Sequence, residues 1–139
     1  MQLEQVQAYL KDALGVEAPI SPWDGAEGLP FFLRDVYDFA VVTLFQTACV
    51  LVIVGKGGER TVDVRRDLDT VARQIPHNTL PIYVTASLAS YERKRLITQG
   101  VPFIVPGNQM FLPHLGLDLR EHFRKRHAMR AAALSPASQ

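Results

Sequence analysis

A glycine-rich segment, Gly55-Lys56-Gly57-Gly58, is the first place where residue types and spacing suggest chemistry. It follows an apolar run and precedes an amphipathic one, so its backbone N–H groups and the start of a helix could face a phosphate. The spacing fits neither a P-loop nor the Gly-x-Gly-x-x-Gly dinucleotide fingerprint. We therefore expect a plain turn here, with a nucleotide- or phosphate-binding enzyme domain as the alternative.

Residues for acid–base, nucleophilic or metal chemistry are scattered along the chain. Its four histidines form no His-x-x-x-His pair and its single cysteine can assist none of them. The Gly-x-Ser-x-Gly motif of a nucleophilic serine does not occur. We expect no catalytic residue, no metal site and no cofactor, and so a protein that is not an enzyme.

Cationic side chains are concentrated in two segments that we expect to be helical. The first is Arg93-Lys94-Arg95. The second contains the five residues Arg120, Arg124, Lys125, Arg126 and Arg130. A solvated helix face is the simplest interpretation, and contact with nucleic acid or an acidic partner protein is the alternative.

Composition places the chain among ordinary globular proteins. Its 139 residues are 47% hydrophobic and 21% charged, with a net charge of +1, so an affinity for polyanions would have to come from a local patch. We expect one domain over residues 1–130 and a linker or disordered tail over residues 131–139. A buried Cys49, no apolar run long enough to span a bilayer and no signal peptide favour a cytoplasmic protein without membrane contact.

Hydrophobic spacing predicts the first half of the fold. Residues 3–14 have the spacing of an amphipathic helix that Gly15 ends, and residues 17–30 are expected to be an irregular loop anchored by Trp23. Residues 39–45 and 48–54 are predicted as an antiparallel hairpin across Gln46-Thr47, with residues 31–36 as a possible further strand. Because residues 49–54 are apolar without alternation, this strand should be buried on both faces, with helices on each side.

The second half alternates between helix and strand. An amphipathic helix over residues 64–75 should stop at Pro76, and a helix capped by Ser87 or Ser90 should end at Gly100. Short strands are expected at 80–85 and 101–105, which gives parallel βαβαβ units with right-handed crossovers. A last helix is expected to begin near Leu117. The predicted class is α/β: a mixed sheet, made of an antiparallel hairpin followed by parallel βαβαβ, sandwiched by helices.

The order helix, three strands, helix, strand resembles that of restriction-endonuclease-like nucleases. Those enzymes place an acid on the second strand and Glu/Gln-x-Lys on the third, where the carboxylates hold Mg²⁺. Residues 48–54 contain no charged side chain, and Asp35 and Asp38 precede the second strand without that partner motif. We expect the element order of these nucleases without their active site.

A set of motifs in the second half of the chain is distinctive. The motifs are Ser90-Tyr91-Glu92-Arg93-Lys94-Arg95-Leu96-Ile97, Val101-Pro102-Phe103-Ile104-Val105-Pro106-Gly107-Asn108-Gln109, Leu112-Pro113 and Asp118-Leu119-Arg120-Glu121. They resemble the amino-terminal domain of a group of bacterial transcription regulators that carry a MarR-like winged helix further along the chain. The likeness covers roughly residues 80–126, with a looser one at residues 29–35.

This resemblance implies a fragment of a longer regulator. Its role would be to sense an effector, to form a homodimer or to position a DNA-binding domain that lies outside this chain. The resemblance supplies no catalytic residue and no named small-molecule effector.

One turn is a candidate ligand site on topological grounds. The segment from Val105 to Gln109 leaves the carboxyl end of a parallel strand, where open α/β sheets place their ligands. Asn108 and Gln109 could offer amide groups there, with Tyr91 and Arg93 close by if the preceding helix packs beside the turn. A purely structural turn is the alternative.

Overall fold

The computed structural model describes residues 3–55 and 63–120, the last four by their backbone alone. The helices are α1 (Leu3–Leu14), α2 (Phe31–Val36), α3 (Val64–Ala72) and α4 (Ser90–Thr98), with 3-10 turns at Asp24–Gly28 and Pro113–Leu115. The strands are β1 (Ser21–Pro22), β2 (Tyr37–Leu44), β3 (Thr47–Val54), β4 (Thr79–Val84), β5 (Phe103–Val105), β6 (Gln109–Leu112) and β7 (Leu117–Arg120).

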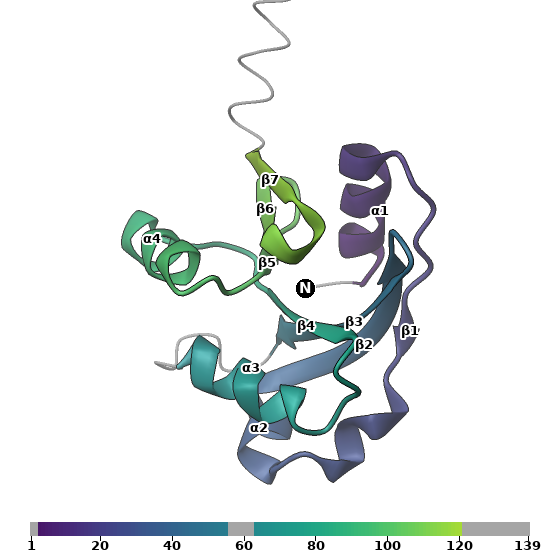
Figure 1. Cartoon of the computed structure of the whole chain (residues 1–139), viewed down its shortest axis with the longest axis vertical. Coiled ribbons are helices and arrows are strands. Elements are labelled where there is room, and N and C mark those ends of the chain that lie inside the picture. The colour runs from purple at the N-terminus through teal and green to yellow at the C-terminus, as the bar shows by residue number, and fades with distance from the viewer. Residues whose placement is uncertain (1–2, 56–62, 121–139) are drawn as a thin grey trace, which may run out of the picture.

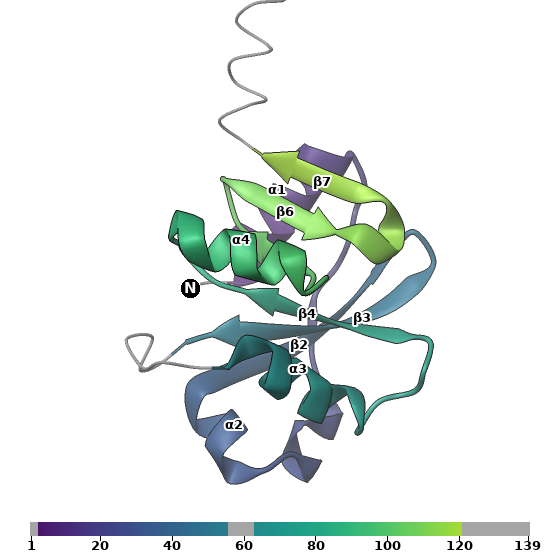
Figure 2. The same ribbon diagram turned by 60° about the vertical axis from the view of Figure 1, so that its left-hand side comes forward.

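The strands form one mixed sheet of seven in which spatial order equals chain order, β1 to β7. Helix α1 covers one face, while α2, α3 and α4 lie over the other (Figure 1, Figure 2). The predicted α/β class, a mixed sheet between helices, is therefore confirmed. Among the described residues no helix is long and apolar enough to cross a membrane.

Helix α1 has the predicted bounds and packs through one stripe. Val6, Tyr9 and Leu10 are buried, at spacings of three and one, against the sheet. Gly15 follows with a φ of +69°, and its N–H donates to the Lys11 carbonyl at 2.8 Å. The left-handed position is one that glycine takes at little cost, which is why the helix ends here.

The predicted hairpin forms, with its turn one residue earlier than expected. β2 and β3 pair antiparallel from Tyr37 opposite Val54 to Leu44 opposite Thr47. The two turn residues are Phe45 and Gln46, with φ of 49° and 67°. Two left-handed residues are the geometry of a tight turn that matches strand twist, here made without glycine.

Strand β3 is buried on both faces, as its uninterrupted apolar sequence predicted. Leu51 and Ile53 face the core beneath α1, and Val50 and Val52 face the core beneath the three other helices. The expected helical cover on both sides is confirmed.

The parallel part of the sheet also matches the prediction. β3 pairs parallel with β4, and β4 with β5, and helices α3 and α4 are the two crossovers. Asp63 caps α3, since its side chain accepts from the Arg66 N–H at 3.1 Å. The cap of α4 was predicted wrongly: neither Ser87 nor Ser90 provides it. Glu92 reaches back instead, and its Oε1 accepts from the Ala89 N–H at 3.0 Å.

The loop over residues 17–30 is more regular than expected. Ser21 and Pro22 pair with β2 as the short edge strand β1, and a 3-10 turn follows over Asp24–Gly28. Proline is tolerated there because an edge strand leaves one row of its backbone groups unpaired. Trp23 does anchor the segment, with its ring 5.9 Å from that of Phe39.

Two predicted elements are of the wrong type. Residues 31–36 form helix α2 rather than a strand, because Leu33 and Val36, three apart, are the positions that the core accepts. Residues 117–120 form strand β7 beside β6, after a turn at Gly116 with φ of +72°, rather than the start of a helix. The rest of that predicted helix and the tail over 131–139 lie outside the described residues.

Candidate functional site

The turn that was predicted to bind a ligand does lie at the carboxyl end of β5. The Asn108 N–H donates to the Val105 carbonyl at 2.9 Å, and Gly107 has a φ of +78°. Asn108 is exposed, whereas Gln109 is buried as the first residue of β6. The two amides that were expected to act together therefore lie in different environments.

The other two predicted ligand residues lie on α4. Tyr91 is 66% exposed with the guanidinium carbon of Arg95 6.0 Å from its ring centre, and Arg93 is half-buried. Neither residue lines the groove that borders the predicted turn. Sequence reasoning placed these residues in one site, but Tyr91, Arg93, Asn108 and Gln109 line neither of the two grooves described below.

A groove of about 540 Å³ lies at the carboxyl edge of the parallel strands. It is lined by Pro106 and Gly107 of the predicted turn, by Ala86 after β4, and by the α1 residues Gln5, Ala8, Tyr9 and Asp12. We call it the carboxyl-edge groove. The sequence indicated the edge but not the α1 wall, because Gln5 and Asp12 have the spacing of a solvated helix face.

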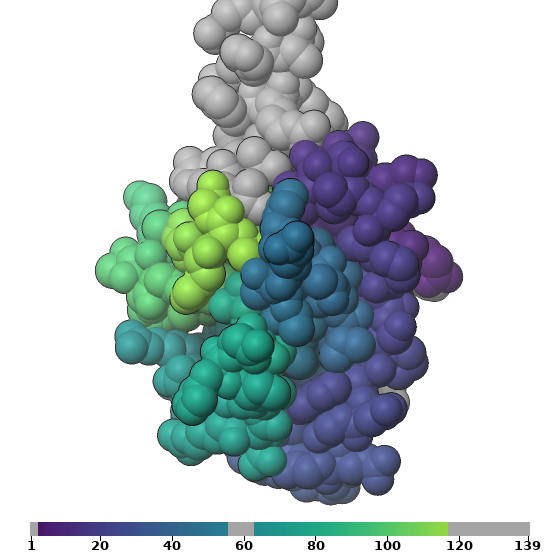
Figure 3. All heavy atoms as spheres, turned by 45° about the vertical axis from the view of Figure 1, so that its right-hand side comes forward, coloured from purple at the N-terminus to yellow at the C-terminus, as the bar shows by residue number. Residues whose placement is uncertain are grey.

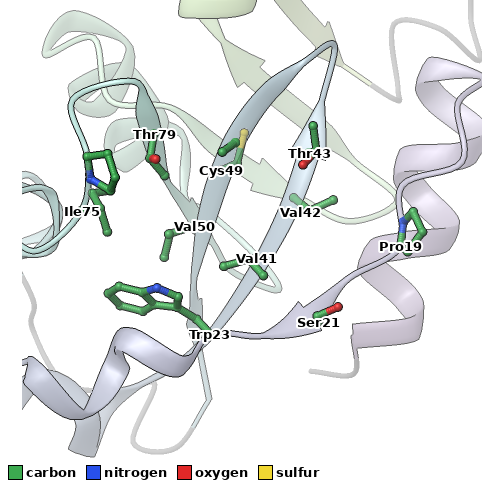
Figure 4. Close-up of a pocket in the computed structure, with 12 residues that line it drawn as sticks. Pro19, Ser21, Trp23, Val41, Val42, Thr43, Cys49, Val50, Ile75 and Thr79 are labelled. Carbon is green, nitrogen blue, oxygen red and sulfur yellow. The ribbon is translucent and has the colours of Figure 1, made fainter.

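A second groove, of about 320 Å³, lies beside Trp23. In Figure 4 the side chains of Trp23, Val50 and Ile75 gather on one side of the β2–β3 hairpin. The residues that line this groove include hydroxyl groups from Ser21, Thr43 and Thr79 but no charged side chain. It is an apolar hollow whose lining singles out no ligand.

A buried polar cluster joins α3 to the sheet. The Tyr37 hydroxyl donates to Asp67 Oδ2 at 2.6 Å, and Asp67 is 3% exposed. Asp67 Oδ1 lies 3.5 Å from Nη2 of the exposed Arg66. The rings of Tyr37 and Tyr83 meet edge to face at 6.4 Å. This arrangement helps to hold α3 against the sheet, because a buried polar side chain is costly unless it is hydrogen-bonded.

Burial changes the acidity of the two tyrosines. It raises the pKa of Tyr37 well above its usual value, and the hydrogen bond to Asp67 and the charge of that carboxylate add to the shift. Burial also raises the pKa of Tyr83, although a hydrogen bond with Thr85 acts in the opposite direction. Both phenols therefore stay protonated at neutral pH, so neither is activated as a base.

Helix α2 presents a surface that sequence reasoning missed. Leu33 and Val36 fill the core, so Phe31 and Phe32 point outward and are 73% and 50% exposed. The guanidinium carbon of Arg34 lies 5.5 Å from the centre of the Phe31 ring, and that of Arg66 lies 5.9 Å from the Phe32 ring. We call these four residues the aromatic surface.

The aromatic surface has the composition of an interface centre. Aromatic residues and arginine are enriched in the buried parts of protein–protein interfaces and supply most of their strongest contacts. Contiguous exposed apolar patches, when large, mark interaction sites on soluble proteins. The signal was present in the sequence as Phe31-Phe32, but residues 31–36 were predicted only as a possible further strand and not as a surface.

The remaining predicted residues fall at the margins of the described chain. Gly55 is described: a Cβ placed there would lie 2.7 Å from Asp38 Oδ2, so the close approach of this carboxylate favours glycine. Lys56, Gly57 and Gly58 lie outside the described residues. Arg120 ends β7, and the other predicted contact residues, Arg124, Lys125, Arg126 and Arg130, lie outside the described residues as well.

Metal ligands do not converge anywhere in residues 3–55 and 63–120: no group of three histidine, cysteine, aspartate or glutamate side chains could hold an ion there. No protein-family model, no curated protein and no solved structure matches this chain. Its candidate function therefore rests on its surfaces and grooves.

Proposed function

We propose that this chain is a non-catalytic interaction module that forms a homodimer through the aromatic surface. The observation that carries the proposal is the exposure of Phe31 and Phe32 side by side. Full burial of a phenylalanine side chain is worth about 1.5–3 kcal/mol, so two rings per copy offer enough free energy to drive association.

A second copy is the partner we favour because charges of both signs lie around the apolar centre: Arg34 and Arg66 belong to the aromatic surface, and Asp35 borders it. Arg34 and Asp35 are consecutive residues of α2 and both are exposed. In a two-fold interface the same patch meets itself, so the cation of each copy approaches the anion of the other. A patch of one sign only would repel its own copy.

The proposed biological setting is a bacterial transcription regulator that contacts DNA through a domain outside this chain. Its support is the resemblance of residues 80–126 to the amino-terminal domain of such regulators. A dimerising module fits that setting because dimeric regulators bind two half-sites with matched spacing. The absence of charged side chains from residues 48–54 is consistent with a module that does no chemistry.

We also propose that the arrangement corresponds to the restriction-endonuclease-like order of elements. Its support is that β1, β2 and β3 are antiparallel after α1, and that α3 then leads to β4, which is parallel to β3. Helix α2, between β1 and β2, departs from that order. The positions at which such nucleases hold carboxylates on the third strand are apolar in β3. The proposal is thus one of shared arrangement and not of shared activity.

Small-molecule sensing is a second candidate function, favoured by the carboxyl-edge groove. Its volume of about 540 Å³ is within the range of about 300–1,000 Å³ that ligand sites occupy. It lies outside the carboxyl ends of β4 and β5, the place where open α/β sheets bind ligands. The Asp12 carboxylate in its wall would favour an effector with a cationic group.

Sedimentation velocity over a range of protein concentrations tests the dimer. The wild-type chain should associate at micromolar concentration, and the double variant Phe31→Ser/Phe32→Ser should weaken association by about a hundredfold or more, since both rings lose their burial. Phe45→Asn is the matched control. It removes a phenylalanine that is 51% exposed in the hairpin turn, at a left-handed position that asparagine tolerates.

Two results would count against the dimer. One is a wild-type chain that stays monomeric at the highest concentration reached. The other is a double variant that associates as strongly as wild type while its circular dichroism and melting temperature show that it is folded.

A further inference from the structure

Helix α4 contacts the sheet through little of its surface. Leu96 is its one buried residue, with Ile97 partly buried beside it. Tyr91, Lys94, Arg95 and Thr98 are all exposed, and their spacings of three, four and seven from Tyr91 place them on a single stripe. We call these four residues the α4 stripe.

The charge of the α4 stripe is of one sign. Lys94 and Arg95 are cations, and the single acidic residue of α4, Glu92, lies off the stripe with its carboxylate bound to the Ala89 N–H. The stripe therefore presents two positive charges beside an aromatic ring. The Arg95 guanidinium carbon is 6.0 Å from the centre of the Tyr91 ring, within the range of a cation–π contact.

We propose that the α4 stripe binds single-stranded nucleic acid, with Tyr91 stacking on a base and Lys94 and Arg95 contacting the phosphates on either side. Exposed aromatic rings with flanking cations are how proteins hold single strands without reading sequence. An acidic peptide would satisfy the two cations but would leave the ring, 66% exposed, without a planar partner. A paired duplex would hide its bases from the ring.

The stripe and the aromatic surface are far enough apart to act independently. Helix α3 lies between α4 and α2 on the same side of the sheet (Figure 1, Figure 2). In the space-filling view the blue-violet segment that contains α2 lies at the bottom of the molecule, away from the green segment that contains α4 (Figure 3). A dimer formed through α2 would leave the α4 stripe accessible.

Fluorescence anisotropy with a labelled oligothymidylate of about 15 nucleotides, at about 50 mM salt, tests the proposal on the full chain. Tyr91→Ala should weaken binding about fivefold or more, whereas Tyr91→Phe, which keeps the ring, should stay within about twofold of wild type. Lys94→Gln/Arg95→Gln should also weaken binding. It should reduce the slope of log affinity against log salt by about 1.4, or about 0.7 for each phosphate contact.

The matched control is Arg65→Gln/Arg73→Gln, which removes two exposed cations from the neighbouring helix region and should leave binding near wild type. Binding that survives both α4 variants but disappears in Arg124→Gln/Lys125→Gln/Arg126→Gln would overturn the proposal. So would equal affinity for a duplex of the same length with no effect of Tyr91→Ala, or equal affinity for polyglutamate.

Discussion

Of the helices in the described part of the chain, α1 covers one face of the sheet, whereas three short helices, α2, α3 and α4, share the opposite face. Beneath α1 the core is mainly aliphatic, with Leu44, Leu51, Ile82 and Met110 fully buried. Beneath the three helices it contains a set of aromatic residues, Tyr37, Tyr83 and Phe103, and it adjoins the buried carboxylate of Asp67.

The outer surfaces differ in the same way. On the three-helix side, α2 exposes Phe31 and Phe32 and α4 exposes Tyr91, each ring with an arginine near it. Helix α1 exposes no large hydrophobic side chain. The comparison teaches that the two faces divide their residues differently: α1 keeps its large apolar side chains in the core, whereas the three-helix side also leaves aromatic rings exposed.

The largest test of this contrast compares two fully buried leucines, Leu10 on α1 and Leu33 on α2. Each substitution to alanine should lower the free energy of unfolding by about 2–5 kcal/mol, measured by urea denaturation, because each leaves a cavity. Leu10→Ala should leave self-association of the folded protein unchanged. Leu33→Ala should weaken it, since Leu33 holds α2 and with it Phe31 and Phe32. If sedimentation velocity showed weaker self-association for Leu10→Ala and none lost for Leu33→Ala, the proposed difference between the two faces would be wrong.

The polar cluster allows a sharper test on the three-helix side. Tyr37→Phe removes the donor to Asp67 Oδ2 and should lower the free energy of unfolding at neutral pH by about 1–3 kcal/mol, because the carboxylate stays buried without it. Tyr91→Phe, which changes an exposed tyrosine, should leave stability within about 0.5 kcal/mol of wild type.

The same variant has a distinct signature at alkaline pH. Since burial and Asp67 raise the pKa of Tyr37, the unfolded chain loses this proton near pH 10, in the range where the folded chain still binds it. Stability should therefore be constant with respect to this group below about pH 10 and fall above it, by about 1.4 kcal/mol per pH unit for each such tyrosine. Tyr37→Phe should make that fall shallower, and an unchanged slope would show that Tyr37 is not the group responsible.

The smallest expected effect concerns the start of α4. Glu92→Ala removes the acceptor for the Ala89 N–H and should cost about 0.5–1 kcal/mol in thermal or urea unfolding. Ser90→Ala is the control and should cost less, because Ser90 does not cap the helix. If Ser90→Ala lowered the free energy of unfolding more than Glu92→Ala, Ser90 would be the cap, as one of the two sequence predictions had it.

The framework of the fold could be predicted because its signals are local and long enough to be unambiguous. Twelve residues with helical spacing before Gly15 define α1, and the unbroken apolar run in β3 defines a strand buried on both faces. Gly100, with a φ of +70°, follows the end of α4 as predicted. Helix α3 ends at Ala72, three residues earlier than its predicted end before Pro76.

The wrong secondary-structure predictions fall on short segments, where contacts with the rest of the fold determine whether the segment is a helix or a strand. Helix α2 has six residues, too few for the spacing of Leu33 and Val36 to outweigh the strand preference of Phe31 and Phe32. Residues 117–120 could continue into a basic helix by sequence, but β6 offers an open edge and takes them as β7.

The candidate site was harder to predict than the fold. The turn after β5 was located correctly, but its groove is completed by α1, far away in the chain. Asp67 was not singled out from the sequence, although it lies three residues from Val64 and four from Val71 and so shares the stripe of α3 that faces the core. That spacing was the available signal for its burial.

Because each strand pairs with the one made just before it, the sheet can grow during synthesis from a single advancing edge. No later strand has to be inserted between two earlier ones. At the other edge of the sheet, β1 is only two residues long and contains a proline, so it offers little backbone for a further strand to pair with. Each strand can thus pair as it leaves the ribosome, because its partner strand is the preceding one in the chain and the sequence separation between them is small. The hairpin of β2 and β3 would be the template onto which everything downstream is added.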